Sequence, residues 1–166
     1  VTLDTIWGKY YASVFKGVDG ISIEDTDYND HILFAYGKAL GQLHILSTEY
    51  SPKNRKWTYH DVLLWIGKVL EEYHTPNKMQ KELDEVWQAL NKLPQTSDTF
   101  GLIHYDFEPD NVFWDENNQH CTAIDFEDSM YHFFLVDLEQ ALDTLLENIP
   151  TDRQLNAKNT FLRGYQ

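Results

Sequence analysis

Several features that would identify particular classes of protein are missing from this sequence. It has one cysteine, Cys121, which excludes an internal disulfide and suits a reducing compartment such as the cytoplasm. It has no run of about 18 apolar residues, so we predict no membrane-spanning segment and no membrane partner. The N-terminus lacks a basic segment followed by an apolar one, so we expect no signal peptide.

Positive charge is also scarce. The chain carries 27 acidic residues against 13 basic ones, a formal net charge of −14. Because such a field repels a polyanion, we predict that the protein does not bind nucleic acid. A cationic small molecule would be attracted, although a solvated acidic surface explains the same excess of acid.

The apolar content is that of a folded protein. At 166 residues, with 42% hydrophobic and 14% aromatic residues, the chain fits one domain with a substantial core. Apolar spacing of three or four predicts helices, and short β-branched or aromatic runs predict strands. Helices are predicted over about 31–46, 58–72, 75–93, 135–149 and 151–166, and strands over 9–16, 21–23, 100–103, 112–114 and 121–124. The predicted fold is α+β and mostly helical, with a small β-hairpin.

Local signals mark where the helices begin. The predicted N-terminal caps are Asp27 or Asn29, Thr58 with Asp61, Thr75 before Pro76, and Thr151 with Gln154. Within the first long helix, Gly37 and Gly41 lie four residues apart, which favours close packing against another element. His44 lies on the apolar side of that helix, so we interpret it as a hydrogen-bonded core histidine and not as a ligand.

Residues 102–126 are the most informative stretch. Two strand-like runs each end at an aspartate, Asp106 and Asp125, and Asn111 follows the first by five residues. A hairpin would bring two carboxylates and one amide together, and such oxygen-rich sites hold Mg²⁺ and orient a hydroxyl at a phosphate. Each aspartate alone is well explained as a turn former at a strand end. The three residues at this combined spacing favour a phosphoryl-transfer site.

These motifs resemble those of the aminoglycoside phosphotransferase and choline kinase-like family of small-molecule kinases. Residues 104–111, His-Tyr-Asp-x4-Asn, are similar to the family's catalytic loop, and residues 124–126, Ile-Asp-Phe, are similar to its metal-binding motif. Residues 40–44, Leu-Gly-Gln-Leu-His, and the pair Asp137-Leu138 match two supporting motifs. Residues 14–17 resemble the hinge that holds the adenine ring.

The resemblance implies a kinase-like C-terminal lobe that uses ATP and Mg²⁺. It implies these roles: Asp106 as the catalytic base, Asn111 and Asp125 as Mg²⁺ ligands, Phe15, Lys16 and Val18 around the nucleotide, Asp128 against the acceptor, and His104 and Asp137 as structural support. Tyr105 departs from the family, where a small residue is commoner, and its ring would narrow the acceptor pocket.

A second departure concerns the nucleotide lobe. Family members have an N-terminal lobe with a phosphate-covering loop and a strand lysine, and Lys16 comes too late in the chain for that role. We therefore expect residues 1–23 to be a hinge strand and linker from an absent N-terminal lobe of the same polypeptide. Residues 24–166 would be the C-terminal lobe, cut at its far end, with feeble activity alone.

The predicted function is ATP- and Mg²⁺-dependent phosphorylation of a hydroxyl on a small molecule. The acidic surface and many aromatics suit a cationic acceptor such as an aminoglycoside or another amino alcohol. Two alternatives remain open at this point. The chain is a kinase-like module that binds a ligand without turnover, or it is a metal-dependent phosphohydrolase, which the scattered histidines disfavour.

Overall fold

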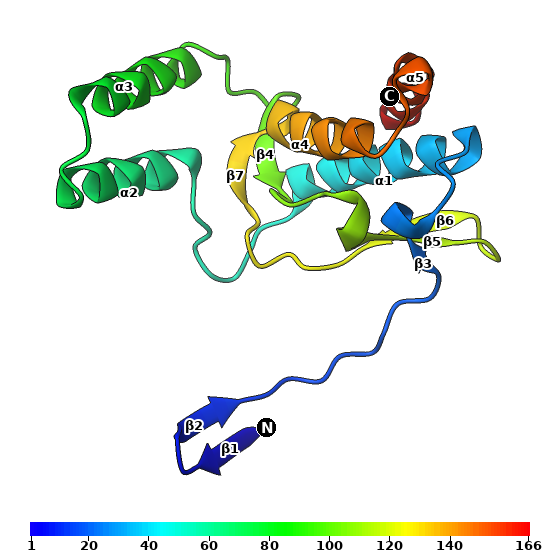
Figure 1. Cartoon of the computed structure of the whole chain (residues 1–166), viewed down its shortest axis with the longest axis horizontal. Helices are drawn as coiled ribbons and strands as arrows, with labels where there is room; N and C mark the ends of the chain where they lie inside the picture. Colours follow the sequence, from blue (N-terminus) through cyan, green and yellow to red (C-terminus); the bar gives the residue numbers. More distant parts are fainter.

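Helices and three small sheets make up the computed structural model, which describes residues 1–166 (Figure 1). The helices are α1 (Asp30–Glu49), α2 (Tyr59–Glu72), α3 (Asn77–Asn91), α4 (Phe134–Glu147) and α5 (Thr151–Tyr165), with 3-10 turns η1 (Ile23–Asp25) and η2 (Pro109–Asn111). The strands are β1 (Thr2–Thr5), β2 (Gly8–Tyr11), β3 (Ile21–Ser22), β4 (Phe100–Ile103), β5 (Val112–Asp115), β6 (His120–Ala123) and β7 (Met130–Phe133). The fold is α+β with helix predominating, as predicted. No helix combines the length and apolarity that crossing a membrane requires.

The sheets are paired differently from the predicted hairpin. β5 and β6 form an antiparallel hairpin, and β3 lies on the outer side of β5. β4 does not join them. It pairs with β7, a strand that the sequence analysis missed, with Gly101 opposite His132. The reason is that residues 104–111 between β4 and β5 form a loop ending in η2, which is too long for a tight turn.

The N-terminal strand is shorter than predicted. β2 ends at Tyr11 instead of reaching residue 16, and its partner β1 was not predicted. Figure 1 shows this two-stranded hairpin standing apart from the body at the end of an extended segment. Without a neighbouring strand to accept and donate backbone hydrogen bonds, residues 12–18 adopt no regular structure.

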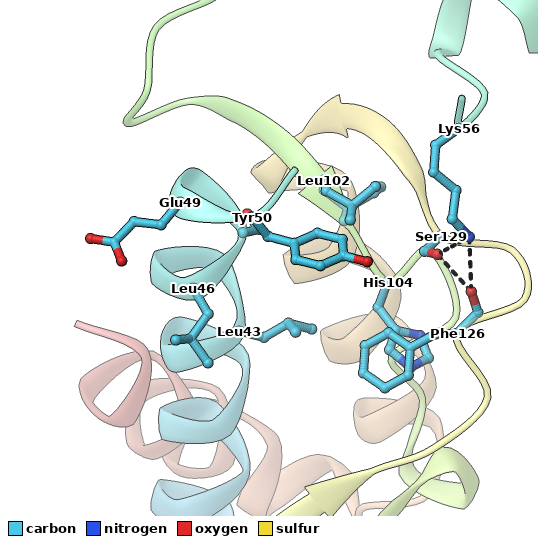
Figure 2. A pocket seen from close by; sticks show the side chains of 11 residues that line it. Leu43, Leu46, Glu49, Tyr50, Lys56, Leu102, His104, Phe126 and Ser129 are labelled. Carbon is cyan, nitrogen blue, oxygen red and sulfur yellow. Dashed lines mark hydrogen bonds between the residues drawn. The ribbon is translucent and has the colours of Figure 1, made fainter. Parts of the chain in front are cut away.

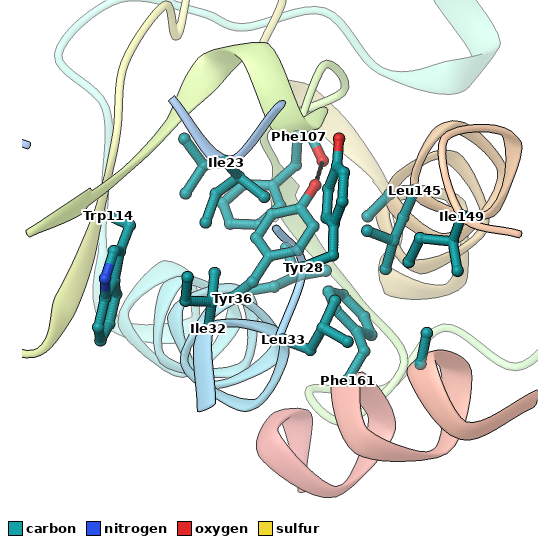
Figure 3. Close-up of a cluster of buried hydrophobic side chains, with 14 residues drawn as sticks. Ile23, Tyr28, Ile32, Leu33, Tyr36, Phe107, Trp114, Leu145, Ile149 and Phe161 are labelled. Atoms are coloured by element: carbon teal, nitrogen blue, oxygen red, sulfur yellow. Dashed lines mark hydrogen bonds between the residues drawn. The ribbon is translucent and has the colours of Figure 1, made fainter. Parts of the chain in front are cut away.

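The main core is built around α1. Its side chains come from α1, α4, α5 and the β5 region, with Tyr36 and Phe107 near the centre (Figure 3). The Tyr36 and Phe107 rings are stacked with centroids 5.3 Å apart, and the Tyr36 hydroxyl donates to the Phe107 carbonyl over 2.6 Å. Burial raises the pKa of Tyr36 well above its usual value, so the hydroxyl keeps its proton as a donor. The core therefore fixes the residue that directly follows Asp106.

Glycines allow α1 and α5 to cross closely, as predicted for Gly37 and Gly41. A Cβ on Gly37 would lie 1.9 Å from the Phe161 carbonyl oxygen, and one on Gly41 would lie 2.4 Å from that of Tyr165. On the facing helix, a Cβ on Gly164 would lie 2.0 Å from the Phe34 carbonyl oxygen. All three obstacles are backbone atoms, so the two helices have no room for larger residues.

Two of the predicted helix caps are confirmed. The Asn29 side chain accepts hydrogen bonds from the backbone N–H groups of His31 and Ile32, at the start of α1. Thr58 and Asp61 form the reciprocal capping box of α2.

The other two predicted caps are wrong. Pro76 and Pro150 occupy the cap positions of α3 and α5, and neither helix has a side-chain cap. The Thr75 hydroxyl instead donates backwards to the Leu70 carbonyl, closing the end of α2. The Gln154 amide likewise donates to Ile149, at the end of the preceding helical segment. Both polar side chains satisfy carbonyls that end a helix instead of amides that start one.

Candidate active site

Asp106 and Asn111 meet in the loop between β4 and β5. The η2 turn brings the chain back on itself, so that the Asn111 side-chain amide donates to the Asp106 carboxylate over 2.7 Å and to its backbone carbonyl over 3.1 Å. Both residues are half-buried. The amide nitrogen of Asn111 is thereby occupied, whereas its side-chain oxygen accepts no hydrogen bond from the protein.

His104 connects this loop to the segment that precedes Asp125. Its ring is fully buried, and Nε2 lies 2.8 Å from the Ile124 carbonyl oxygen. Nδ1 accepts the backbone N–H of Asp106 over 3.3 Å, which requires the proton on Nε2 and makes Nε2 the donor to Ile124. The Ile124 N–H donates in turn to the Asn111 carbonyl over 3.0 Å. One imidazole therefore holds the chain at Asp106 and the chain next to Asp125.

Asp137, near the start of α4, supports the same loop from within the core. One carboxylate oxygen accepts the backbone N–H of His104 over 2.8 Å and the other accepts that of Tyr105 over 2.7 Å. His44 Nε2 lies 3.0 Å from the first oxygen, and His44 Nδ1 lies 2.8 Å from the Tyr165 hydroxyl. The prediction that His44 is a hydrogen-bonded core histidine is confirmed.

The backbone is strained at two places in the site. Tyr105 has φ of 69° and Asp125 has φ of 59°, in the left-handed region that costs a residue with a side chain about 1–3 kcal/mol. Tyr105 is held there by its hydrogen bond to Asp137, and Asp125 follows the tethered Ile124. Strain kept in place by surrounding contacts is typical of functional sites.

Asp125 lines a cavity together with the predicted hinge. The cavity, of about 850 Å³, brings Phe15, Lys16 and Val18 to Asp125 and also takes in Phe113. Phe113 was missed by the sequence analysis. Val112 and Trp114 on either side are buried, and alternation along β5 turns Phe113 to the opposite face. The run 112–114 is apolar throughout, so nothing in the sequence indicates which of these residues faces the cavity.

Asp128 lies in a different, smaller cavity. This cavity of about 300 Å³ lies between residues 55–57 and residues 127–130. Asp128 makes no hydrogen bond to Asp106, Asn111 or Asp125. The two cavities share one lining residue, Glu127, and are therefore adjacent on either side of the turn after Asp125.

A third cavity lies behind this turn and is mainly apolar. Figure 2 shows its wall, which includes Leu43, Leu102 and Phe126, with His104 at its base. Its volume is about 560 Å³. His104, which bonds to Ile124, and Phe126, which follows Asp125, thus form the boundary between this cavity and the site.

The charges of the site favour oxygen-donor chemistry over thiol chemistry. Partial burial and the neighbouring Asp106 raise the pKa of Glu108, two residues along the loop. Burial raises the pKa of Cys121 to about 12, so this thiol is not a nucleophile at neutral pH. No group of three or more His, Cys, Asp or Glu residues is arranged to hold a metal. The oxygen atoms of Asp106, Asn111 and Asp125 are hard donors that fit a divalent cation completed by phosphate oxygens and water.

Comparison with known proteins gives consistent matches. The family model described as "Phosphotransferase enzyme family" matches residues 3–166. Amicoumacin kinase of Bacillus subtilis (strain 168) is 26% identical over 144 residues, which are 84% of this chain and 41% of that protein. The chain thus spans less than half the length of this curated relative.

Two solved structures share the fold. The amicoumacin kinase hAmiN in complex with AMP-PNP, Ca2+ and Ami is 24% identical with a TM-score of 0.73, over 90% of this chain and 47% of that one. The microcompartment-associated aminopropanol kinase is 17% identical with a TM-score of 0.58, over 99% of this chain and 54% of that one. At these identities the structural likeness establishes the fold alone. The chemistry of the site has to be inferred from its own residues.

Proposed function

This chain belongs to the phosphotransferase enzyme family, and from that premise we propose that the full-length protein transfers a phosphoryl group from ATP to a hydroxyl of a small molecule. The observation that carries the proposal is the way His104 joins two loops. It bonds to the Asp106 N–H and to the Ile124 carbonyl, so that the loop of Asp106 and Asn111 is tied to the chain entering Asp125. Phosphoryl transfer depends mainly on such positioning.

Asp106 is proposed as the residue that orients the acceptor hydroxyl and accepts its proton. Its carboxylate is half-buried and held by the Asn111 amide over 2.7 Å, which fixes the direction of the remaining oxygen. Support for this role comes from the backbone of the loop, where His104 and Tyr105 both donate to Asp137. A base held in one orientation removes an entropic part of the activation barrier.

Asn111 and Asp125 are proposed to hold Mg²⁺. When bound, the ion would neutralise charge on the phosphates during transfer. The residues contribute hard oxygen donors, and the Asn111 side-chain oxygen has no protein partner that would compete. The β5–β6 hairpin brings the loops of Asn111 and Asp125 together at its open end, because Val112 pairs with Ala123 and the Ile124 N–H donates to the Asn111 carbonyl over 3.0 Å.

The nucleotide is proposed to occupy the 850 Å³ cavity next to Asp125. The aromatic rings of Phe15 and Phe113 line it and suit a purine, while Phe15, Lys16 and Val18 offer backbone groups for the base edge. Residues 1–23 would then act as the hinge segment and residues 24–166 as the catalytic lobe. We place the reaction in the cytoplasm, because a chain with a single cysteine suits a reducing compartment.

For the acceptor we propose a cationic amino alcohol, the class to which aminopropanol belongs. Asp128 and Glu127 put carboxylates in the cavity beside the Asp125 turn, opposite a wall formed by Trp57 with Arg55 and Lys56. Arg55 is paired with Asp61 and Lys56 bonds to Ser129, which leaves the two carboxylates without an ion-pair partner. An ammonium group is attracted to the carboxylates and to an aromatic face. Aminoglycosides, which are polyamines with many hydroxyls, fall in the same class.

The direct test is phosphate transfer by the full-length protein with Mg-ATP across a panel of amino alcohols, aminoglycosides and neutral alcohols. Asp106→Asn should lower kcat by at least about 100-fold, because an amide cannot accept the proton. Asp110→Asn, an exposed aspartate in the same loop, is the matched control and should keep near-normal turnover.

Other outcomes would separate the rival functions. Normal turnover by Asp106→Asn would contradict the role of Asp106. Tight nucleotide binding with no transfer to any acceptor would favour a non-catalytic binding module. Release of free phosphate without an acceptor would indicate a phosphohydrolase, for which the chain offers no group of three or more His, Cys, Asp or Glu residues arranged around a metal.

A further inference from the structure

Lys56 bonds to the turn that directly follows Asp125. Its ammonium donates to the Ser129 hydroxyl over 2.7 Å and approaches the Phe126 carbonyl oxygen at 3.5 Å. The Ser129 hydroxyl donates to the same Phe126 carbonyl over 2.6 Å, which closes a three-membered network (Figure 2). Lys56 comes from the connection between α1 and α2, about 70 residues earlier in the chain.

The segment that carries Lys56 is itself held on both sides. Arg55 binds the Asp61 carboxylate through two contacts of 2.7 and 2.9 Å, and Asp61 also closes the capping box of α2. The Arg55 contact and the Thr58 hydrogen bonds lower the pKa of Asp61 to about 2, so this carboxylate stays ionised at neutral pH. The Trp57 carbonyl accepts the Tyr131 N–H over 2.8 Å. Lys56 therefore projects from a fixed support.

The ammonium of Lys56 has no ion-pair partner. The salt bridges of the chain involve other residues, and Lys56 donates only to a hydroxyl and a carbonyl. Placing a half-buried ammonium against neutral oxygens loses hydration without the compensation of a carboxylate. The contacts of Lys56 are therefore better explained by what they do for the turn formed by residues 126–129 than by a gain in overall folding stability.

We propose that Lys56 is a positioning residue that holds Asp125 in its metal-binding conformation; this rests on the proposed role of Asp125. Asp125 has φ of 59°, which the surrounding contacts must maintain. Upstream, Ile124 is held by His104 and Asn111. Downstream, Phe126 is held by Lys56 and Ser129. The Ser129 N–H also donates to the Phe126 carbonyl over 3.3 Å, and the Phe126 ring packs against that of His104. Lys56 adds the only cationic contact to this turn, and that contact comes from the connection between α1 and α2.

The experiment measures binding of Mn²⁺ to the full-length protein by electron paramagnetic resonance, in the presence of a non-hydrolysable ATP analogue. Lys56→Met should weaken Mn²⁺ binding by about 10- to 100-fold, the range typical of residues that orient a metal ligand. Lys53→Met, an exposed lysine of the same connection with the same charge change, should bind as the wild type does. In turnover assays at saturating acceptor, Lys56→Met should raise the KM for Mg²⁺.

A second variant makes the test independent of how well Lys56→Met folds. Ser129→Ala removes the hydroxyl that links Lys56 to Phe126 and should weaken Mn²⁺ binding in the same direction. The double variant should be less impaired than the product of the two single effects, because both act through one network. Thermal melting of each variant shows whether the chain is folded.

The outcomes separate this inference from the proposed function. Asp125→Ala should abolish the Mn²⁺ binding that depends on the nucleotide analogue, and if it does not, the proposed role of Asp125 is wrong. If Asp125→Ala abolishes binding while Ser129→Ala and Lys56→Met bind within about twofold of wild type, the positioning role of Lys56 is wrong and the proposed function stands. A lower kcat with unchanged metal affinity would also overturn it, since Lys56 would then act on the transferred phosphate.

Discussion

Among single residues, Asp137 shows how the fold controls the candidate site. Its carboxylate is fully buried. One oxygen accepts the His104 N–H and also contacts the His44 ring, and the other accepts the Tyr105 N–H. A buried carboxylate is tolerated only where hydrogen bonds replace its hydration, and here the donors belong to the loop that leads to Asp106. The same interactions therefore satisfy the buried carboxylate and restrain Tyr105 in its left-handed conformation.

Asp137→Asn is expected to destabilise the protein by about 3 kcal/mol. The amide keeps one acceptor oxygen, but its NH₂ group faces a backbone N–H and leaves that buried donor unpaired. Urea unfolding followed by tryptophan fluorescence measures the change. Asp143→Asn, on an exposed position of the same helix, should change stability by less than about 0.5 kcal/mol. Equal midpoints for the two variants would contradict the role given to Asp137.

The residues of the site differ in how far the sequence predicts them. Asp106 and Asn111 lie within one short loop, and their hydrogen bond follows from local spacing. The contact of Lys56 with Ser129 joins residues 73 apart, and that of His44 with Tyr165 joins residues 121 apart. Composition and periodicity carry no information about such pairings, because they depend on how the helices pack. The local motifs can therefore be predicted from the sequence, whereas the network of distant residues that holds them in place cannot.

Among the elements, the helices were predictable and the strand pairing was not. The apolar faces of α1, α2 and α4 follow from spacing along a helix, which is a local property. β7 is short and begins directly before α4, so its residues give no run long enough to show alternation. Its pairing with β4 is set by tertiary packing, as is the isolated bridge between Thr58 and Tyr131. The sequence analysis therefore predicted that β4 pairs with β5, the next strand along the chain, and missed its pairing with β7.

At this scale, Gly37→Ala is expected to lower the free energy of unfolding by about 2–4 kcal/mol. The new methyl group would lie 1.9 Å from the Phe161 carbonyl oxygen, so α1 and α5 would have to separate. Gly67→Ala in α2 is the matched control, since its Cβ would meet only the Leu83 side chain at 3.5 Å. That change should raise stability by about 0.5–1 kcal/mol through helix propensity. Denaturant unfolding of both variants measures the difference, and a stabilised Gly37→Ala would rule out the close crossing.

Across the whole molecule, the segment 124–129 is the meeting point of distant parts. It borders the cavity with the hinge residues, the smaller cavity that contains Asp128, and the mainly apolar cavity lined by His104. The helices α2 and α3 stand to one side of the body and are joined to it through residues 55–58 and β7 (Figure 1). Lys56 and Trp57, in the connection that leads into α2, bond to Ser129 and Tyr131, so this connection directly contacts the turn after Asp125.

The charge of the whole chain leads to a prediction about the acceptor. With a net charge of −14, the chain should raise the local concentration of a cationic acceptor, and salt should screen that effect. Raising ionic strength from about 0.05 to about 0.5 M should increase the KM for an amino alcohol by about fivefold or more, with kcat little changed, at saturating Mg-ATP. The N-acetylated form of the same alcohol has the same hydroxyl without the charge, so its KM should be nearly independent of salt. If both acceptors show the same salt dependence, acceptor charge is not recognised, and the acidic excess serves only to solvate the surface.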